Sequence, residues 1–290
     1  MKKIVTIFKN FGFQIKADNL NSFASSCAFF IFLSIIPMIM LLFSIIPYTP
    51  IDPGLVNKWV LEEFPADTGA VLISILEEVS NRSFGILSVT AIAMLWSAGK
   101  GINSLIAGFN AIDGNIDKRN WIVLRLISMI YTLLFLLGII VVLFFAVGGN
   151  FLLDNFMQLF PALAVYVKKL VSFRFLISVL LFSFIFMLCY SLLPYKKHKF
   201  RETFPGAIIS ALFWTGFSYL FSIYVNRFNA FSIYGSLTAI IVLMVWLYFC
   251  MYIVFIGDNL NKYFSPVIKV LFTKGVNIEE VKNRLKEIDE

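Results

Sequence analysis

The residues that could bind a ligand or do chemistry are few, and they lie within or beside long apolar segments. Lys100 is followed three and four residues later by Asn103 and Ser104, so a cation and two hydrogen-bonding groups share one face of a helix. The candidate residues of an intramembrane cavity or headgroup site are Trp96, Ser97, Lys100, Asn103, Tyr234, Gly235, Ser236, Asp258 and Asn261. This set indicates either a cavity that takes an anionic headgroup or, more simply, interfacial anchors and polar contacts between helices.

The sequence lacks the residue constellations of common enzymes. The single histidine, His198, lies in a basic loop, so neither a histidine-based zinc site nor a Ser-His-Asp triad has its parts. Cys27, Cys189 and Cys250 fall inside apolar segments without CxxC spacing, and we expect them to be buried, unreactive thiols. There is no glycine-rich phosphate loop either. We therefore predict no catalytic residues, no metal site and no cofactor, and hence a protein that is not an enzyme.

The composition excludes most soluble classes of protein. Of the 290 residues 60% are apolar and 14% charged, whereas soluble domains average about 45–50% apolar and about 25% charged residues. The 33 Phe and only three Cys also exclude a disordered chain and a disulfide scaffold. Because one soluble core of this size could not bury so much apolar surface, the sequence indicates an integral membrane protein. The apolar residues form solid blocks without strand-like alternation, which indicates helices.

Six charge-poor windows approach or exceed the roughly 20 residues that a helix needs to cross a bilayer. We predict an all-α, polytopic membrane protein with six transmembrane helices. The predicted spans are residues 24–48, 84–111, 126–150, 175–195, 203–226 and 232–257. They form one membrane domain over residues 1–265, which a cytoplasmic tail follows over residues 266–290. Asp258 lies at the inner end of the last span, where it can pair with Lys262 at i+4.

Shorter segments around these spans carry amphipathic patterns. Residues 1–20 mix apolar side chains with four Lys, which favours a helix lying in the membrane interface. Residues 49–83, between the first two spans, predict two short amphipathic helices on the extracytoplasmic side. Small residues four apart, such as Gly206 and Ser210, let helices approach closely. Pro37 is expected either to bend the first span or to be accommodated within it.

The distribution of Lys and Arg predicts the orientation of the chain. With the N-terminus inside, eighteen of the 24 Lys and Arg fall in cytoplasmic segments, so we expect both termini in the cytoplasm. The net charge of +7 then follows from topology, because the cations are spread over several short loops rather than gathered on one folded surface. We therefore predict no nucleic-acid partner, and we expect these loops to be attracted to anionic lipid of the cytoplasmic leaflet.

Four stretches, in order along the chain, carry a resemblance to a known family. They are ASSCAFFIFLSIIPMIMLL in the first span, LWSAGKGINSLIAGFNAIDG in the second, LLPYKKHKFRETFPGAIISALFW across the fourth and fifth, and YGSLTAIIVLMVWLYFCMYIVFIGDNLN in the last. Through them the chain resembles the YihY family, also called the BrkB virulence-factor family, of bacterial inner-membrane proteins. The resemblance implies a six-helix, multi-pass protein of the bacterial cytoplasmic (plasma) membrane with both ends inside. Some members were once labelled ribonuclease BN, which this sequence does not support because it has no histidine-rich metal motif.

Two functions follow as hypotheses. Lys100 inside an apolar span, the prolines and the amphipathic outer loop favour transport or handling of an envelope lipid or small molecule through an intramembrane cavity. The alternative is a non-transporting membrane scaffold that binds other envelope proteins. The expected partners are membrane lipids, with an anionic lipid headgroup or a small molecule as the candidate ligand. The sequence predicts neither the substrate nor the oligomeric state.

Overall fold

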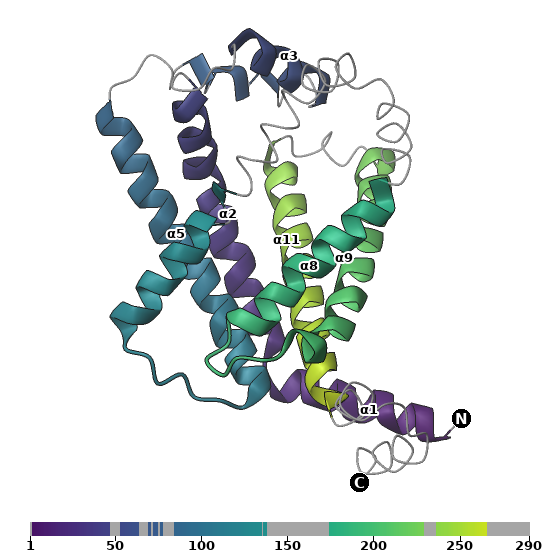
Figure 1. Ribbon diagram of the computed structural model, residues 1–290. Helices are drawn as coiled ribbons and strands as arrows, with labels where there is room; N and C mark the ends of the chain where they lie inside the picture. The colour runs from purple at the N-terminus through teal and green to yellow at the C-terminus, as the bar shows by residue number, and fades with distance from the viewer. Residues whose placement is uncertain are drawn as a thin grey trace, which may run out of the picture. The chain divides into compact units, whose positions relative to one another are not determined.

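The computed structural model describes residues 2–46, 53–63, 69–70, 72–74, 76–77, 84–134, 136–137, 174–228 and 236–265. Within these residues the chain is helical apart from turns and short loops, as the solid apolar blocks predict (Figure 1). The labelled helices are α1 (Lys2–Ala17), α2 (Leu20–Ile45), α3 (Pro53–Glu63), α5 (Phe84–Asp113), α8 (Arg174–Leu192), α9 (Phe200–Phe228) and α11 (Ser236–Tyr263). A further apolar helix covers Trp121–Leu134.

Within the described residues, three helices contain stretches long and apolar enough to cross a membrane. These stretches are Leu20–Ser44 in α2, Phe200–Val225 in α9 and Ile240–Tyr263 in α11. Two shorter apolar helices, Trp121–Leu134 and Ser178–Leu192, coincide with parts of the third and fourth predicted spans. Most of the third predicted span lies outside the described residues. So do the segment between the third and fourth predicted spans and the C-terminal tail, and the count of six spans therefore stays a prediction.

Local signals set several helix ends, and these ends differ by a few residues from the predicted spans. Asn19 separates α1 from α2 with a φ of 52°, a left-handed conformation that Asn tolerates better than most residues, so α2 begins at Leu20 rather than at residue 24. Gly114 ends α5 with a φ of 67°. There the Asn115 N–H donates to the Asn110 carbonyl at 2.9 Å, as in a Schellman motif. The lengths of charge-free stretches do not locate these helix ends, because each helix continues from its apolar residues into polar ones.

Prolines act differently in different helices. α2 continues through Pro37 and α9 through Pro205, so neither residue terminates its helix. α8 ends at Leu192, three residues before the predicted limit, because Pro194 disfavours helical backbone in the residue before it. Whether Pro37 has a functional role therefore stays a prediction.

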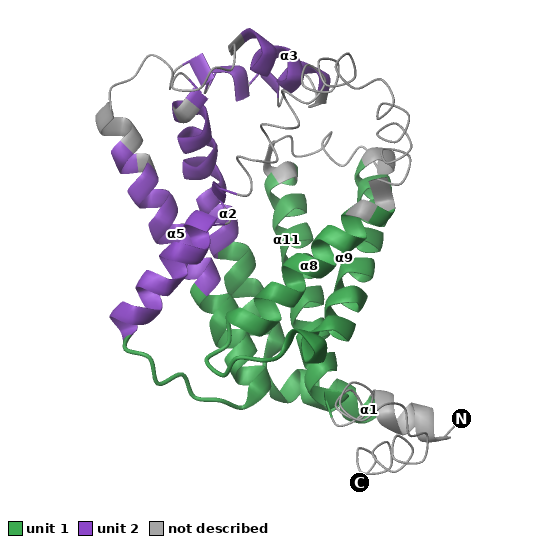
Figure 2. Cartoon of the chain, viewed as in Figure 1, with its two compact units in different colours: residues 1–29, 103–120, 174–290 green, residues 30–102, 121–173 purple. Residues whose placement is uncertain are grey.

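The chain divides into two compact units, each built from separated stretches of sequence (Figure 2). Unit 1 comprises Met1–Phe29, Asn103–Asn120 and Arg174–Glu290. Within it α9 packs against both α8 and α11, and α1 contacts α11. Its core is aromatic: the ring centroid of Phe109 lies 5.5 Å from that of Tyr190 and 5.5 Å from that of Phe255, both in edge-to-face geometry. Unit 1 thus holds one end of α5 against the last three labelled helices.

Unit 2 comprises Phe30–Ile102 and Trp121–Phe173, so α2 and α5 each contribute to both units. Its first core cluster joins Leu41 of α2, Met94 of α5 and Leu136. A second cluster joins Val56 and Val60 of α3 to Leu76, within the predicted outer loop. The apolar positions of this loop therefore bury one another, as amphipathic helices do. The expectation of one membrane domain over residues 1–265 stays a prediction.

Many large apolar side chains point outward from these helices. Ile36 of α2, Val89 of α5 and Phe213 of α9 are 64%, 67% and 65% exposed. Water-soluble monomers rarely present so many apolar side chains to the solvent. Together with the spanning stretches, this outward apolar surface shows that the chain is built to lie in lipid.

Candidate functional site

The predicted site residues lie on two helices, with Trp96 to Asn103 on α5 and Asp258 and Asn261 on α11. Trp96, Ser97 and Lys100 belong to unit 2, whereas Asn103, Asp258 and Asn261 belong to unit 1. Tyr234 and Gly235 lie outside the described residues, and Ser236 is the first residue of α11. Ser104, predicted to share a face with Lys100, forms a 2.8 Å hydrogen bond with Ser26 of α2 within unit 1. We therefore describe two polar sites, one in each unit.

The site in unit 2 is centred on the indole ring of Trp96. The guanidinium carbon of Arg125, from helix Trp121–Leu134, lies 4.2 Å from the ring centroid. Nζ of Lys100 lies 5.9 Å from the same centroid and 5.2 Å from that of Phe30 on α2. Cation–π contacts of this kind contribute about 0.5–1 kcal/mol each at exposed sites. The ring of the half-exposed Trp96 thus contacts two cations from two helices.

Arg125 is the member of this site that the sequence analysis missed. Its Nη2 donates to the Trp96 carbonyl at 2.7 Å, while its Nε is buried and has no hydrogen-bond partner among the described residues. Ser97, which was predicted to belong to the site, instead donates its hydroxyl to the Ala93 carbonyl of its own helix at 2.9 Å. In the sequence, Arg125 serves only as one of the Lys and Arg residues that predict the orientation of the chain. No local pattern places its side chain beside a residue 29 positions earlier.

In unit 1, α9 and α11 are joined by polar groups at a close approach. The Gly206 N–H donates to Oδ1 of Asn261 at 2.7 Å, and Nδ2 of Asn261 donates to the Thr203 carbonyl at 3.1 Å. The Tyr190 hydroxyl lies 2.9 Å from Oγ of Ser210 and 2.8 Å from the Val254 carbonyl. Asn261 therefore links the two helices directly, which is the polar-contact alternative of the sequence analysis.

A group of ionisable residues gathers around the C-terminal end of α11. Asp258 is buried on this helix, and its charge is repelled by that of Asp113 and attracted by that of Lys262. The expected contact between Asp258 and Lys262 is replaced by another, because Nζ of Lys262 donates to the Ile112 carbonyl. Nδ2 of Asn259 donates to Oδ2 of Asp18 at 2.8 Å. Two carboxylates of unit 1 thus approach α11 from α5 and from the α1–α2 junction.

The environment of Asp18 opposes its ionisation. Burial raises the pKa of its carboxyl, and this effect outweighs the opposite effects of the Lys262 charge and the Asn259 hydrogen bond. Asn259 is fully buried, and its Oδ1 has no hydrogen-bond partner among the described residues. These groups make the C-terminal end of α11 a buried polar region of unit 1.

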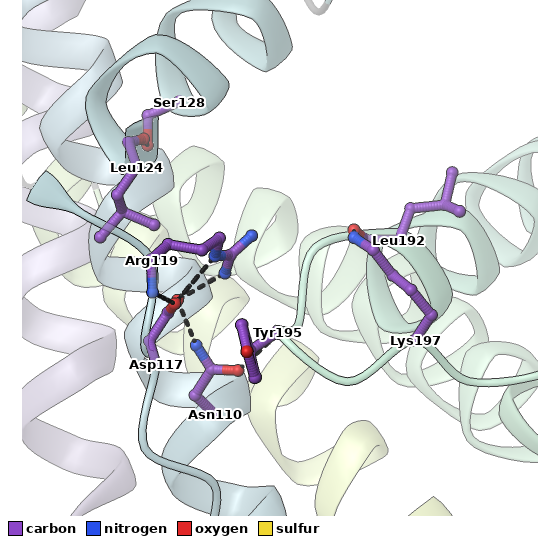
Figure 3. A network of polar contacts seen from close by, with 8 residues as sticks. All are labelled: Asn110, Asp117, Arg119, Leu124, Ser128, Leu192, Tyr195 and Lys197. Atoms are coloured by element: carbon purple, nitrogen blue, oxygen red, sulfur yellow. Dashed lines mark hydrogen bonds and ion pairs between the residues drawn. The ribbon is translucent and has the colours of Figure 1, made fainter. Parts of the chain in front are cut away.

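The KKHKFR loop is tied to the end of α5 by two polar links. Nε2 of His198 lies 2.7 Å from Oδ2 of Asp113. Asn110 accepts the Tyr195 N–H at 2.7 Å and donates to Oδ2 of Asp117 at 3.0 Å (Figure 3). Asn110 and Asp113 lie within the quoted LWSAGKGINSLIAGFNAIDG stretch, but the sequence offered no partner for either. The lone histidine thus joins two segments that lie 85 residues apart.

Asp117 and Arg119 form an ion pair beside this link. The contribution of this ion pair to the stability of the fold should depend on pH. Hydrogen bonds from Arg119 hold the pKa of the Asp117 carboxyl below its ordinary value of 3.8. A lowered pKa means that the pair stabilises the folded state above pH 3.8 and that this contribution disappears as the pH falls through the lowered value. We expect Asp117→Asn to cost about 1–2 kcal/mol at pH 7 and progressively less as the pH falls below 3.8.

Unfolding of the detergent-solubilised protein, followed from pH 7 to pH 3, checks this expectation. Glu62→Gln is the matched control, because Glu62 pairs with Lys58 at 3.9 Å on an exposed surface where a salt bridge contributes little. A stability difference that is the same at both ends of the pH range would contradict the role of the Asp117 charge.

Helices of membrane-spanning length, an outward apolar surface and polar groups buried between helices define the class: this is an all-helical membrane protein. A sequence model of the family described as Virulence factor BrkB matches residues 13–272. The chain therefore belongs to the BrkB family, as the four sequence stretches predicted.

Two of the three relatives described next are named as membrane proteins. A ribonuclease-like protein, YfkH, of Bacillus subtilis (strain 168) is 30% identical over 82% of this chain and 87% of its own length. A UPF0761 membrane protein of Histophilus somni (strain 129Pt) is 26% identical over 97% of both chains. Another UPF0761 membrane protein, from Idiomarina loihiensis, is 28% identical over 87% of this chain and 88% of its own. No solved structure matches the chain.

Proposed function

We propose that this membrane protein transports or otherwise handles an envelope lipid or a small molecule through an intramembrane cavity. The observation that carries the proposal is Asp258, a carboxylate only 6% exposed on α11. It lies in the stretch Ile240–Tyr263, which is apolar and long enough to cross a bilayer. An ionisable side chain is costly in such a helix and commonly marks the pathway of a substrate, an ion or a proton.

The neighbourhood of Asp258 supports this assignment over a purely structural one. Asn261 and Tyr190 each have hydrogen-bond partners that explain their burial by helix packing. Asp258 instead lies among groups of both signs, with the like charge of Asp113 and the opposite charge of Lys262. A buried carboxyl group with charges of both signs nearby can change its protonation state or its partner when a substrate arrives. The role proposed for Asp258 is to change its protonation state or its ion partner when the transported species binds.

Flux across reconstituted vesicles tests the proposal. Proteoliposomes would be loaded with fluorescent phosphatidylglycerol or phosphatidylethanolamine, and the rate at which labelled lipid reaches the opposite leaflet would be measured. We expect wild-type protein to accelerate this exchange and Asp258→Asn, which preserves the shape of the side chain, to reduce the acceleration about tenfold or more. Glu62→Gln, at an exposed acid of α3, should leave the rate unchanged.

The scaffold hypothesis predicts a different outcome. A scaffold would show no flux with either lipid, and it would copurify from membranes with a stable protein partner. Unchanged flux in a folded Asp258→Asn protein would reject Asp258 as the responsive group. The expectation that the protein is not an enzyme is part of the proposal, since transport requires no covalent chemistry.

A further inference from the structure

One face of unit 2 is apolar and open to its surroundings. It is formed by helix Trp121–Leu134 and by the part of α5 that Arg125 contacts through Trp96. Side chains on this face that are more than half-exposed are Val89, Ile92, Trp121, Ile122, Leu126 and Ile130. In a membrane protein such a face meets lipid acyl chains rather than water.

Two cations interrupt this face at one place. Arg125 lies next to the exposed Leu126 on the same helix, and Lys100 reaches the same Trp96 ring from α5. Cations beside hydrocarbon are costly unless a counter-charge accompanies them. A half-exposed Trp between them is typical of the level of lipid headgroups, where indole rings gather.

Arg125 also has hydrogen-bonding capacity left over. One of its terminal nitrogens donates to the Trp96 carbonyl, but its buried Nε has no partner among the described residues. A guanidinium presents its donors as a planar fork that matches the oxygens of a phosphate. Because this guanidinium makes one hydrogen bond among the described residues, its terminal nitrogens have donors left for the oxygens of a phosphate.

We propose that Trp96, Lys100 and Arg125 bind the phosphate of an anionic phospholipid, whose acyl chains lie along the exposed apolar face of helix Trp121–Leu134 and α5. The apolar face favours a phospholipid over free phosphate, because a free anion would leave that face without an occupant. The net negative charge of the lipid matches the two cations, which a zwitterionic lipid would neutralise less well. This site goes beyond the proposed function, since a lipid can be bound here whether or not the protein transports anything.

Binding by the full-length protein in a neutral detergent tests the site. Native mass spectrometry would count bound lipid during titrations with phosphatidylglycerol, phosphatidylcholine and inorganic phosphate. We expect phosphatidylglycerol to bind about tenfold more tightly than phosphatidylcholine, and inorganic phosphate to compete only weakly. Arg125→Gln should weaken phosphatidylglycerol binding about tenfold, and Lys100→Gln should weaken it severalfold.

Lys58→Gln is the matched control, because Lys58 is an exposed cation of α3, where it pairs with Glu62 at 3.9 Å. This change removes one positive charge elsewhere and should leave lipid binding unchanged. If Arg125→Gln is not recovered folded, Lys100→Gln decides the test. Wild-type affinity for phosphatidylglycerol in both folded variants would overturn the site. Equal binding of inorganic phosphate would overturn the choice of a phospholipid. Neither result would depend on the flux assay.

Discussion

Gly257→Ala is expected to destabilise the protein by about 3 kcal/mol or more, because α9 and α11 leave no space for a methyl group at this position. A Cβ on Gly257 would overlap Oγ of Ser210 and would lie 2.8 Å from the Tyr190 hydroxyl and 2.9 Å from the Gly206 carbonyl oxygen. The carbonyl is backbone, and the two hydroxyls are hydrogen-bonded to each other at 2.9 Å. The helices would therefore have to separate, and their polar contacts would weaken together.

Gly216→Ala provides the matched control for this prediction. Gly216 lies on α9, and nothing stands within 4 Å of a Cβ built there. We expect this change to be neutral or to stabilise the helix by up to about 1 kcal/mol, since Ala favours helix more than Gly does. Chemical unfolding of both variants in detergent, followed by circular dichroism, measures the difference. Equal stability of the two variants would show that α9 and α11 do not approach each other as closely as described.

Asn261→Ala is expected to cost about 2–4 kcal/mol through the loss of two buried hydrogen bonds. The Gly206 N–H would lose the acceptor that lies 2.7 Å away, and the Thr203 carbonyl would lose the donor at 3.1 Å. Both groups are buried in the first two turns of α9, so water cannot replace the lost partner. Truncation also leaves a small cavity between α9 and α11, which adds to the cost.

Asn21→Ala is the control for the loss of an asparagine without burial. Its Oδ1 accepts from the Tyr248 hydroxyl at 3.4 Å in an exposed position, so we expect a change within about 0.5 kcal/mol. Unfolding curves of the two alanine variants under identical detergent conditions check the contrast. A loss of stability from Asn261→Ala no larger than that from Asn21→Ala would contradict the linking role of Asn261.

The position of the helices is the part of the fold that the sequence predicts well. α2, α5, α8, α9 and α11 all overlap predicted spans, because apolar runs and caps act over a few neighbouring residues. The small-residue pair Gly206 and Ser210 was also found, and both residues lie where α9 approaches α11. Helix ends were less accurate, since turns such as those at Asn19 and Gly114 fall outside the apolar windows.

The candidate sites were predicted only in part. Lys100 and Trp96 were named, and the structure adds Arg125 beside them. Asn103 and Ser104 were expected on one helix face with Lys100, and all three residues lie on the continuous helix α5. Asp258 was named for its place in the last span, while Asp113 and Asp18 were not associated with it. Each missed residue belongs to another helix or turn, so spacing along one segment could not reveal it.

The sequence by itself determined that this is an all-helical membrane protein of the BrkB family, because hydropathy and the four quoted stretches depend only on the order of residues. The tertiary structure decided which polar groups meet. Arg125 contacts a residue 29 positions away, Asn261 one 55 positions away and His198 one 85 positions away. Such pairings depend on the packing of whole helices, where one turn of rotation or one residue of shift changes every partner. Local sequence places a helix but does not select its neighbour.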